Sequence, residues 1–254
     1  PKRAQWYVRE AGQKTGDWAD YLRGATWALS NKIGMAGNQL VGNFQQAFQP
    51  QIIKLWAQED KTPYYDLLSA ASKFSFFLLL VCVMPLICFT EFFLGIWLKG
   101  ELPPQVVLFI RLAVVFTLTE ALAAPFWTGI QATGKIALYQ VSVSAIISSV
   151  FFIGWLLFAL NFPAWWVMML NILASVACHL YRIVHLKIAT GFPLGRYMLR
   201  SMVPVIAVSF ICALLTVKTP LIACLACPLV VIALGVSGEE RRFVLSVIRK
   251  RLGR

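Results

Sequence analysis

Six long apolar blocks follow one another through most of the sequence, and they constrain the fold more than any other feature. Each block is long enough, with some tilt and flanking residues, to cross a hydrocarbon core about 30 Å thick as an α-helix. Backbone amides inside a bilayer must be satisfied within their own segment, so helices are the economical interpretation. The sequence therefore predicts an all-α, polytopic membrane helix bundle. The blocks are residues 74–90, 106–130, 138–160, 164–181, 201–217 and 219–236.

The composition agrees with this interpretation. The chain is 59% hydrophobic and only 13% charged, with a mean hydropathy of +0.72, which argues against a soluble domain with a polar surface. The six cysteines lie inside or at the edges of apolar blocks, where they are expected to act as small packing residues. Cys224 and Cys227 form a CxxC pair with no second Cys or His pair nearby, so we expect no metal site and no cofactor.

The net charge of +12 would suit nucleic acid, but the basic residues follow the membrane instead. If block 74–90 runs outward, fourteen basic residues fall on the inner side and two, Lys99 and Lys218, on the other. This asymmetry predicts that the C-terminus is cytoplasmic and that nucleic acid is not a partner. The inner residues are Lys54, Lys61, Lys73, Lys135, Arg182, Lys187, Arg196, Arg200, Arg241, Arg242, Arg249, Lys250, Arg251 and Arg254.

The C-terminal residues 237–254 form a separate, basic segment. Ser237 and Glu240 make an S-x-x-E capping box, and the following helix places Phe243 and Val247 on one face and basic residues on the other. Such a helix is expected to lie on the inner leaflet and attract anionic lipid. The alternative is a simple stop-transfer anchor that obeys the charge rule.

Residues 25–48 have a helical rhythm but carry many amides, which a lipid-facing helix would not tolerate. We interpret this segment as a seventh helix that lines a water-filled cavity; the alternative is a helix packed in the bundle through interhelical hydrogen bonds. The bundle would then extend over residues 25–236. The candidate cavity residues are Asn31, Lys32, Asn38, Gln39 and Gln45.

Two ionisable residues, Arg111 and Glu120, lie within a membrane block, where an unpaired charge is costly. About 13.5 Å of helical rise separates them, so they cannot pair with each other. Arg111 is near the outer end and is within reach of Glu91, which predicts either a structural ion pair or a substrate contact. Glu120 is deeper, and we consider both a hydrogen bond to a neighbouring helix and an ion-coupling site.

Several strings of this sequence occur together, in order, along residues 22–254. They are NQLVGNFQQAFQPQIIKLWAQED, SKFSFFLLLVCVMPLI, TEFFLGIWLKGELP, QATGKIALYQ and GEERRFVLSVIRKRL. Together they resemble the C-terminal half of bacterial polysaccharide or O-antigen flippases of the multidrug, oligosaccharidyl-lipid and polysaccharide exporter superfamily. The resemblance implies two pseudo-symmetric bundles of six helices around a central cavity, often with two extra helices at the C-terminus. This chain would hold about seven of these helices, those of the second bundle and the extra ones.

The sequence departs from the pattern of this family at its N-terminal end. The first bundle is absent, and residues 1–24 show no apolar helix, so we interpret this N-terminal segment as poorly defined, as from a truncation or a frameshift, or as a cytoplasmic start with a non-spanning helix. A single half-bundle is not expected to transport on its own.

The family's substrate is a polyprenyl-pyrophosphate-linked oligosaccharide, used for O-antigen or capsule at the bacterial inner membrane. Lys32 is the candidate for the diphosphate, and the neighbouring amides are candidates for the sugars. The implied partners are membrane lipids and the polymerase and glycosyltransferases of the same pathway. We expect no catalytic residues.

Two alternatives remain open. A multidrug or cation antiporter of the same superfamily would use Glu120 as its ion-coupling acid. A membrane-embedded glycosyl- or acyltransferase is disfavoured because no paired carboxylates or histidines face one side, and His179 and His185 are expected to snorkel at an inner helix end.

Overall fold

The computed structural model describes residues 35, 39, 42–98 and 104–236. Within these residues the chain is helical and contains no strand. Five helices are long and apolar enough to cross a membrane, as expected of a multi-pass helical membrane protein, and this confirms the predicted fold class. The N-terminal segment 1–24 and the basic segment 237–254 lie outside the described residues.

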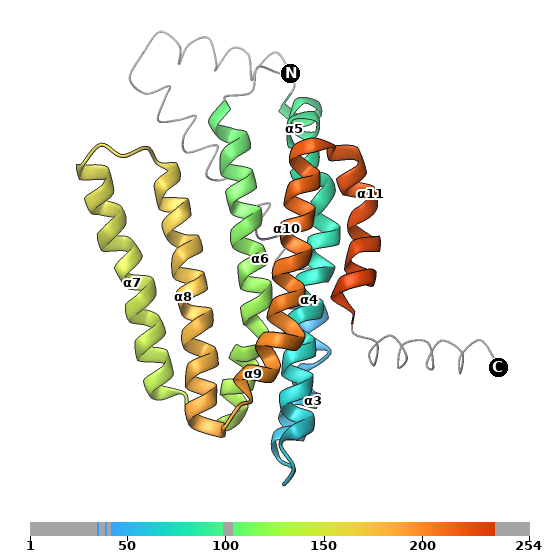
Figure 1. Cartoon of the computed structure of the whole chain (residues 1–254). Coiled ribbons are helices and arrows are strands. Elements are labelled where there is room, and N and C mark those ends of the chain that lie inside the picture. Colours follow the sequence, from blue (N-terminus) through green and yellow to red (C-terminus); the bar gives the residue numbers. More distant parts are fainter. Residues whose placement is uncertain (1–34, 36–38, 40–41, 99–103, 237–254) are drawn as a thin grey trace, which may run out of the picture.

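The long helices alternate in direction, so that α4 begins at the end of the bundle where α6 finishes (Figure 1). Helix α9, the π-helical segment η1 and α10 follow one another as a single candidate span, Leu194–Lys218. The described elements are α3 (Gln49–Trp56), α4 (Thr62–Cys88), α5 (Thr90–Leu98), α6 (Pro104–Thr133), α7 (Ala137–Ala159), α8 (Trp165–Thr190), α9 (Leu194–Tyr197), η1 (Met198–Met202), α10 (Val203–Lys218), α11 (Pro220–Val230) and η2 (Val231–Gly235).

Several helices extend well beyond the predicted apolar blocks. Helix α4 begins at Thr62 rather than at residue 74, and α8 continues to Thr190 rather than ending at residue 181. The additional turns are amphipathic, because they bury one face, including Tyr64 and Leu186, against neighbouring helices. Hydropathy therefore marked the part of each helix suited to lipid, and not the whole helix.

The sixth block gives a shorter element than predicted. Helix α11 and η2 together form one apolar helix, Pro220–Gly235, which is shorter than the five candidate spans. At 1.5 Å per residue this length reaches about 24 Å, less than the hydrocarbon thickness of about 30 Å. The segment is apolar and helical as expected but shorter than predicted, and its crossing of the membrane stays a prediction.

Helices α4 and α6 form the centre of the bundle, and α7 lies at its edge. Helix α6 packs against both α4 and α8, whereas the main partner of α7 is α8 alone. Half of the most apolar window of α4 and of α6 is buried, compared with 11% of that of α7. The large side chains of α7, among them Phe151 and Trp155, are consequently exposed where lipid would surround them.

Two large hydrophobic clusters make up most of the interior, and a small third one consists of Leu94, Val106 and Ile110. The first, here called the aromatic cluster, consists of Ile52, Tyr64, Leu68, Phe126, Ile130, Tyr139, Val143, Cys178, Ile183, Leu186, Phe192 and Tyr197. The second, here called the aliphatic cluster, consists of Phe76, Phe77, Leu79, Leu80, Met84, Val114, Leu118, Ala121, Val205, Val208, Cys212, Ala223, Cys227 and Val231. Helix α4 contributes its first turns to the aromatic cluster and its later turns to the aliphatic cluster.

A sharp turn after α8 brings part of the aromatic cluster into place. Gly191 has a positive φ of 78°, and its N–H donates to the carbonyl of Lys187, which ends the helix. Glycine adopts this left-handed conformation without steric cost. The chain can therefore reverse within a few residues and place Phe192, which is 1% exposed, in the interior.

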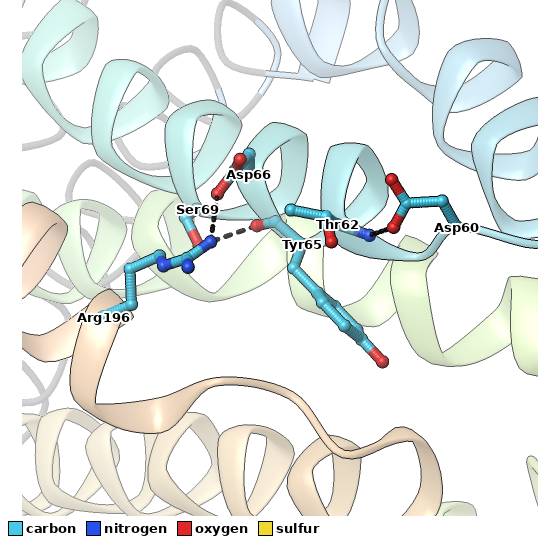
Figure 2. A network of polar contacts seen from close by, with 6 residues as sticks. All are labelled: Asp60, Thr62, Tyr65, Asp66, Ser69 and Arg196. Atoms are coloured by element: carbon cyan, nitrogen blue, oxygen red, sulfur yellow. Dashed lines mark hydrogen bonds and ion pairs between the residues drawn. The ribbon is translucent and has the colours of Figure 1, made fainter.

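Polar contacts tie the first turns of α4 to α9 at the same end of the bundle (Figure 2). Arg196 Nη1 lies 3.6 Å from Asp66 Oδ1, and both side chains are about half exposed. The backbone N–H of Thr62 donates to Asp60 Oδ1 at 2.9 Å, and this bond holds the pKa of the exposed Asp60 carboxyl below its usual range. These contacts lie where the sequence predicts the cytoplasmic ends of the spans.

Candidate functional site

Polar side chains from four helical segments meet in the interior of the bundle. Ser175 and His179 are four residues apart on α8, so they lie on one face of that helix, and both are 5% exposed. Glu120 on α6 contacts Ser175, and Tyr197 on α9 contacts His179. Buried polar groups of this kind persist when they are hydrogen-bonded, and the contacts here form two sets, one around Glu120 and one around His179.

Glu120 accepts a hydrogen bond from one hydroxyl group, which itself accepts from a second. Ser175 Oγ donates to Glu120 Oε1 at 2.5 Å, and Thr119 Oγ1 donates to Ser175 Oγ at 3.0 Å. Glu120 thus makes the hydrogen bond to a neighbouring helix that was one of its two predicted roles. A half-buried carboxylate with a fixed donor can also accept a proton or a cation, so its ion-coupling role stays a prediction.

His179 lies at the start of a second set of contacts. Its Nε2 is 3.2 Å from Tyr197 Oη, which in turn is 3.3 Å from Ser72 Oγ on α4. Ser72 Oγ donates to the carbonyl oxygen of Leu122 at 2.5 Å. His179 Nδ1 is buried and has no hydrogen-bond partner in the described structure. These contacts connect α4, α8 and α9 through side chains, and they reach α6 through the Leu122 carbonyl.

The expectation that His179 and His185 snorkel at a helix end was wrong. His179 is 5% exposed, and its ring contacts Phe126 and Tyr197 edge to face. The His185 ring packs against both Tyr139 and Tyr181, and its Nε2 is also buried. Because α8 continues beyond the apolar block, both histidines lie on its packed face rather than at its end.

Lys73 is the functional candidate that the sequence reasoning missed. It was counted with the basic residues of an inner segment, but it is the twelfth residue of α4 and only 1% exposed. Its ammonium lies 5.3 Å from the centre of the Phe74 ring. Pro63 at the first turn of α4 is a typical helix start and was the signal that could have placed Lys73 inside the helix.

The predicted cavity residues are only partly described. Asn31, Lys32 and Asn38 lie outside the described residues, and Gln39 is exposed. Gln45 is half-buried, and its Nε2 donates to the carbonyl oxygen of Ala121 on α6 at 3.2 Å. Gln45 therefore makes an interhelical hydrogen bond, as the alternative of a packed helix predicted.

The other predicted charges do not meet. Glu91 on α5 and Arg111 on α6 are both exposed, and no ion pair joins them among the residues that the structure describes. Within the same residues, no group of three or more His, Cys, Asp or Glu side chains is placed to hold a metal ion. The interior contacts around Glu120, His179 and Lys73 are thus the candidate site.

Comparisons with protein families, with curated proteins and with solved structures find no match to this chain.

Proposed function

We propose that this chain is part of a transporter that moves polyprenyl-pyrophosphate-linked oligosaccharide across the bacterial inner membrane for O-antigen or capsule synthesis. The sequence resemblance to the flippases motivates the proposal. The observation that carries it is the burial of Lys73 in the interior of a multi-pass bundle. A lysine within a membrane span costs about 3 kcal/mol on insertion scales, so its presence there calls for a function.

The chemistry of the interior fits such a substrate. A diphosphate needs cations, which Lys73 and the predicted Lys32 supply through charge-assisted hydrogen bonds. Sugars need hydroxyl and amide partners, and Ser72, Ser175 and Gln45 are of these types. The protein would bind and move its substrate without catalytic residues or cofactors, beside the polymerase and glycosyltransferases that use the same lipid.

The proposed topology follows from the ends of the helices. The end of the bundle with Lys54, Lys61, Lys135 and Arg196 would face the cytoplasm, and the basic segment 237–254 would lie on that side. Lys218, at the end of α10, would lie on the opposite side.

The proposal is tested by editing the native gene and scoring surface polysaccharide. Lys73→Met keeps a side chain of similar length but removes the charge, so membrane insertion should not suffer while surface glycan falls at least tenfold. Lys73→Arg should keep part of the activity.

Lys54→Met is the matched control, because Lys54 is exposed on α3. Lys32→Ala, tested in parallel, should also lose glycan at equal protein abundance. Normal display by both Lys73→Met and Lys32→Ala would refute the proposal.

A second candidate is the ion-coupled antiporter of the same superfamily, which is favoured by the hydrogen bond from the Ser175 hydroxyl to Glu120. Glu120→Gln keeps an oxygen that can accept from Ser175 but removes the titratable charge. Under this alternative, Glu120→Gln abolishes resistance to cationic drugs, and surface glycan is unchanged by any of the variants.

A further inference from the structure

A compact group of aromatic and basic side chains lies where α7 and α8 pack together near the α6–α7 connection. Arg182 Nε donates to Tyr139 Oη at 2.7 Å. The rings of Tyr139 and Tyr181 stack with centres 6.1 Å apart, and the His185 ring lies within 6 Å of both. We call these four residues, Tyr139, Tyr181, Arg182 and His185, the Arg182 cluster. None of them belongs to the contacts around Glu120 and Lys73.

The cluster lies at the end of the bundle where the sequence predicts a membrane interface. Tyr139 is the third residue of α7, and the short connection before it carries the exposed Lys135. Tyrosine and tryptophan rings favour this level, and Trp127 also contacts Tyr139, with ring centres 5.3 Å apart. A phospholipid headgroup would therefore be at the same depth as the cluster.

Arg182 has hydrogen-bonding capacity left after its contact with Tyr139. A guanidinium offers five N–H donors, and the bond to Tyr139 uses the one on Nε. No carboxylate is within ion-pair distance of Arg182 among the residues that the structure describes. The fixed fork of a guanidinium suits two oxygens of one phosphate. His185 lies one turn further along α8, and its Nε2 is buried without a hydrogen-bond partner in the described structure.

The surroundings indicate a lipid as the source of that phosphate. Leu138 and Val141, which flank Tyr139 on α7, are 70% and 68% exposed. They continue into the large apolar face of a helix that is buried over only 11% of its most apolar window. An acyl chain could lie along this face while its headgroup reaches the cluster.

We propose that the Arg182 cluster binds the phosphate of an anionic phospholipid from the surrounding leaflet. Arg182 bonds the phosphate oxygens, the Tyr139 hydroxyl fixes the orientation of the guanidinium, and the exposed face of α7 contacts the acyl chains. Lys135 adds a second positive charge at the same level. This inference does not depend on what the protein transports.

Binding is measured on the purified full chain in neutral detergent by native mass spectrometry and by the shift of the thermal unfolding midpoint. Dioleoylphosphatidylglycerol, dioleoylphosphatidylcholine and sodium phosphate are titrated separately. Phosphatidylglycerol should bind and raise the midpoint, whereas the other two should have little effect. Arg182→Gln should weaken phosphatidylglycerol binding about tenfold or more, the size expected for a lost charge-assisted hydrogen bond.

Two further variants separate a specific site from general electrostatics. Tyr139→Phe leaves the charge unchanged and releases Arg182, so it should weaken binding several-fold even if Arg182→Gln fails to fold. Arg196→Gln removes the same charge from the same end of the bundle but lies in the ion pair with Asp66, so it should bind like the unaltered chain.

Three results would overturn the proposal. One is equal affinity of the unaltered chain and Tyr139→Phe for phosphatidylglycerol. Another is an equal loss of affinity in Arg196→Gln and Arg182→Gln, which would indicate a diffuse basic surface. The third is stabilisation by sodium phosphate that matches that by phosphatidylglycerol, which would identify a site for free phosphate.

Discussion

The aromatic and aliphatic clusters share α4 and α6 but are stabilised differently. In the aromatic cluster the buried tyrosines all bond: Tyr64 Oη donates to the Gly129 carbonyl at 2.9 Å, Tyr139 accepts from Arg182, and Tyr197 meets His179 and Ser72. The aliphatic cluster relies mainly on the contacts of leucine, valine, alanine and cysteine side chains. Directional bonds select one arrangement of helices, whereas aliphatic packing tolerates small shifts.

The two regions also differ in their surroundings. The aromatic cluster lies at the end of the bundle where α4 begins and α8 finishes, near the predicted membrane interface (Figure 1). Hydroxyl groups are well suited to this level, because they can exchange bonds with water during folding. The aliphatic cluster lies along the later turns of α4 and against α10 and α11, where apolar packing needs no polar partner. We therefore expect substitutions at the two regions to have different costs.

The largest effect is expected from Phe126→Ala. Phe126 is fully buried and contacts the rings of His179, Phe192 and Tyr197 edge to face, so its loss leaves a cavity in the aromatic cluster. We expect a cost of about 3 kcal/mol, the low end of the range for such substitutions, because detergent or lipid replaces water as the reference. The free energy of unfolding in detergent micelles measures this cost.

The control Phe151→Ala, on the exposed face of α7, should change stability by no more than about 0.5 kcal/mol. Equal costs for both would contradict the burial of Phe126.

An intermediate effect is expected from Tyr197→Phe. The ring is kept, but His179 Nε2 and Ser72 Oγ each lose a partner in the interior, which typically costs about 1–3 kcal/mol. Thr117→Val is the matched control, since Thr117 is also buried but its hydroxyl bonds only to the Ala113 carbonyl one turn earlier in its own helix. Both variants are compared by the same unfolding measurement. A Tyr197→Phe variant as stable as Thr117→Val would show that the tyrosine bonds do not hold the helices together.

The smallest effect is expected from Gly129→Ala. A Cβ at Gly129 would lie 2.9 Å from Leu68 Cδ1 and 3.0 Å from Tyr64 Oη, which is itself bonded to the Gly129 carbonyl. The strain, about 1–3 kcal/mol, is offset in part by the better helix propensity of alanine, about 1 kcal/mol. Gly154→Ala should instead stabilise the protein, because the nearest atom to its Cβ would be Val167 Cγ2 at 3.8 Å, an ordinary contact distance. Stabilisation of the protein by Gly129→Ala would mean that α4 and α6 are not closely packed there.

Much of the candidate site could not be predicted from the sequence. Ser72 and Tyr197 are 125 residues apart, and no periodic pattern indicates that their hydroxyls meet. His179 lies near the end of an apolar block and Lys73 lies directly before one, and hydropathy gives no information there about which face of an amphipathic turn is packed. Both residues were therefore misplaced. Glu120 was found because a carboxylate inside an apolar block stands out without any knowledge of its neighbours.

The sequence by itself determined that the chain is helical, that it has long apolar spans, and that basic residues gather at one end of them. These are local properties, since bilayer thickness and the cost of exposed backbone amides act on each segment separately. The tertiary structure alone decided which helices are central, which face of each helix is buried, and which polar groups pair. Lipid tails are as apolar as the side chains between the helices, so helix association depends on detailed packing and hydrogen bonds. Hydropathy does not encode these.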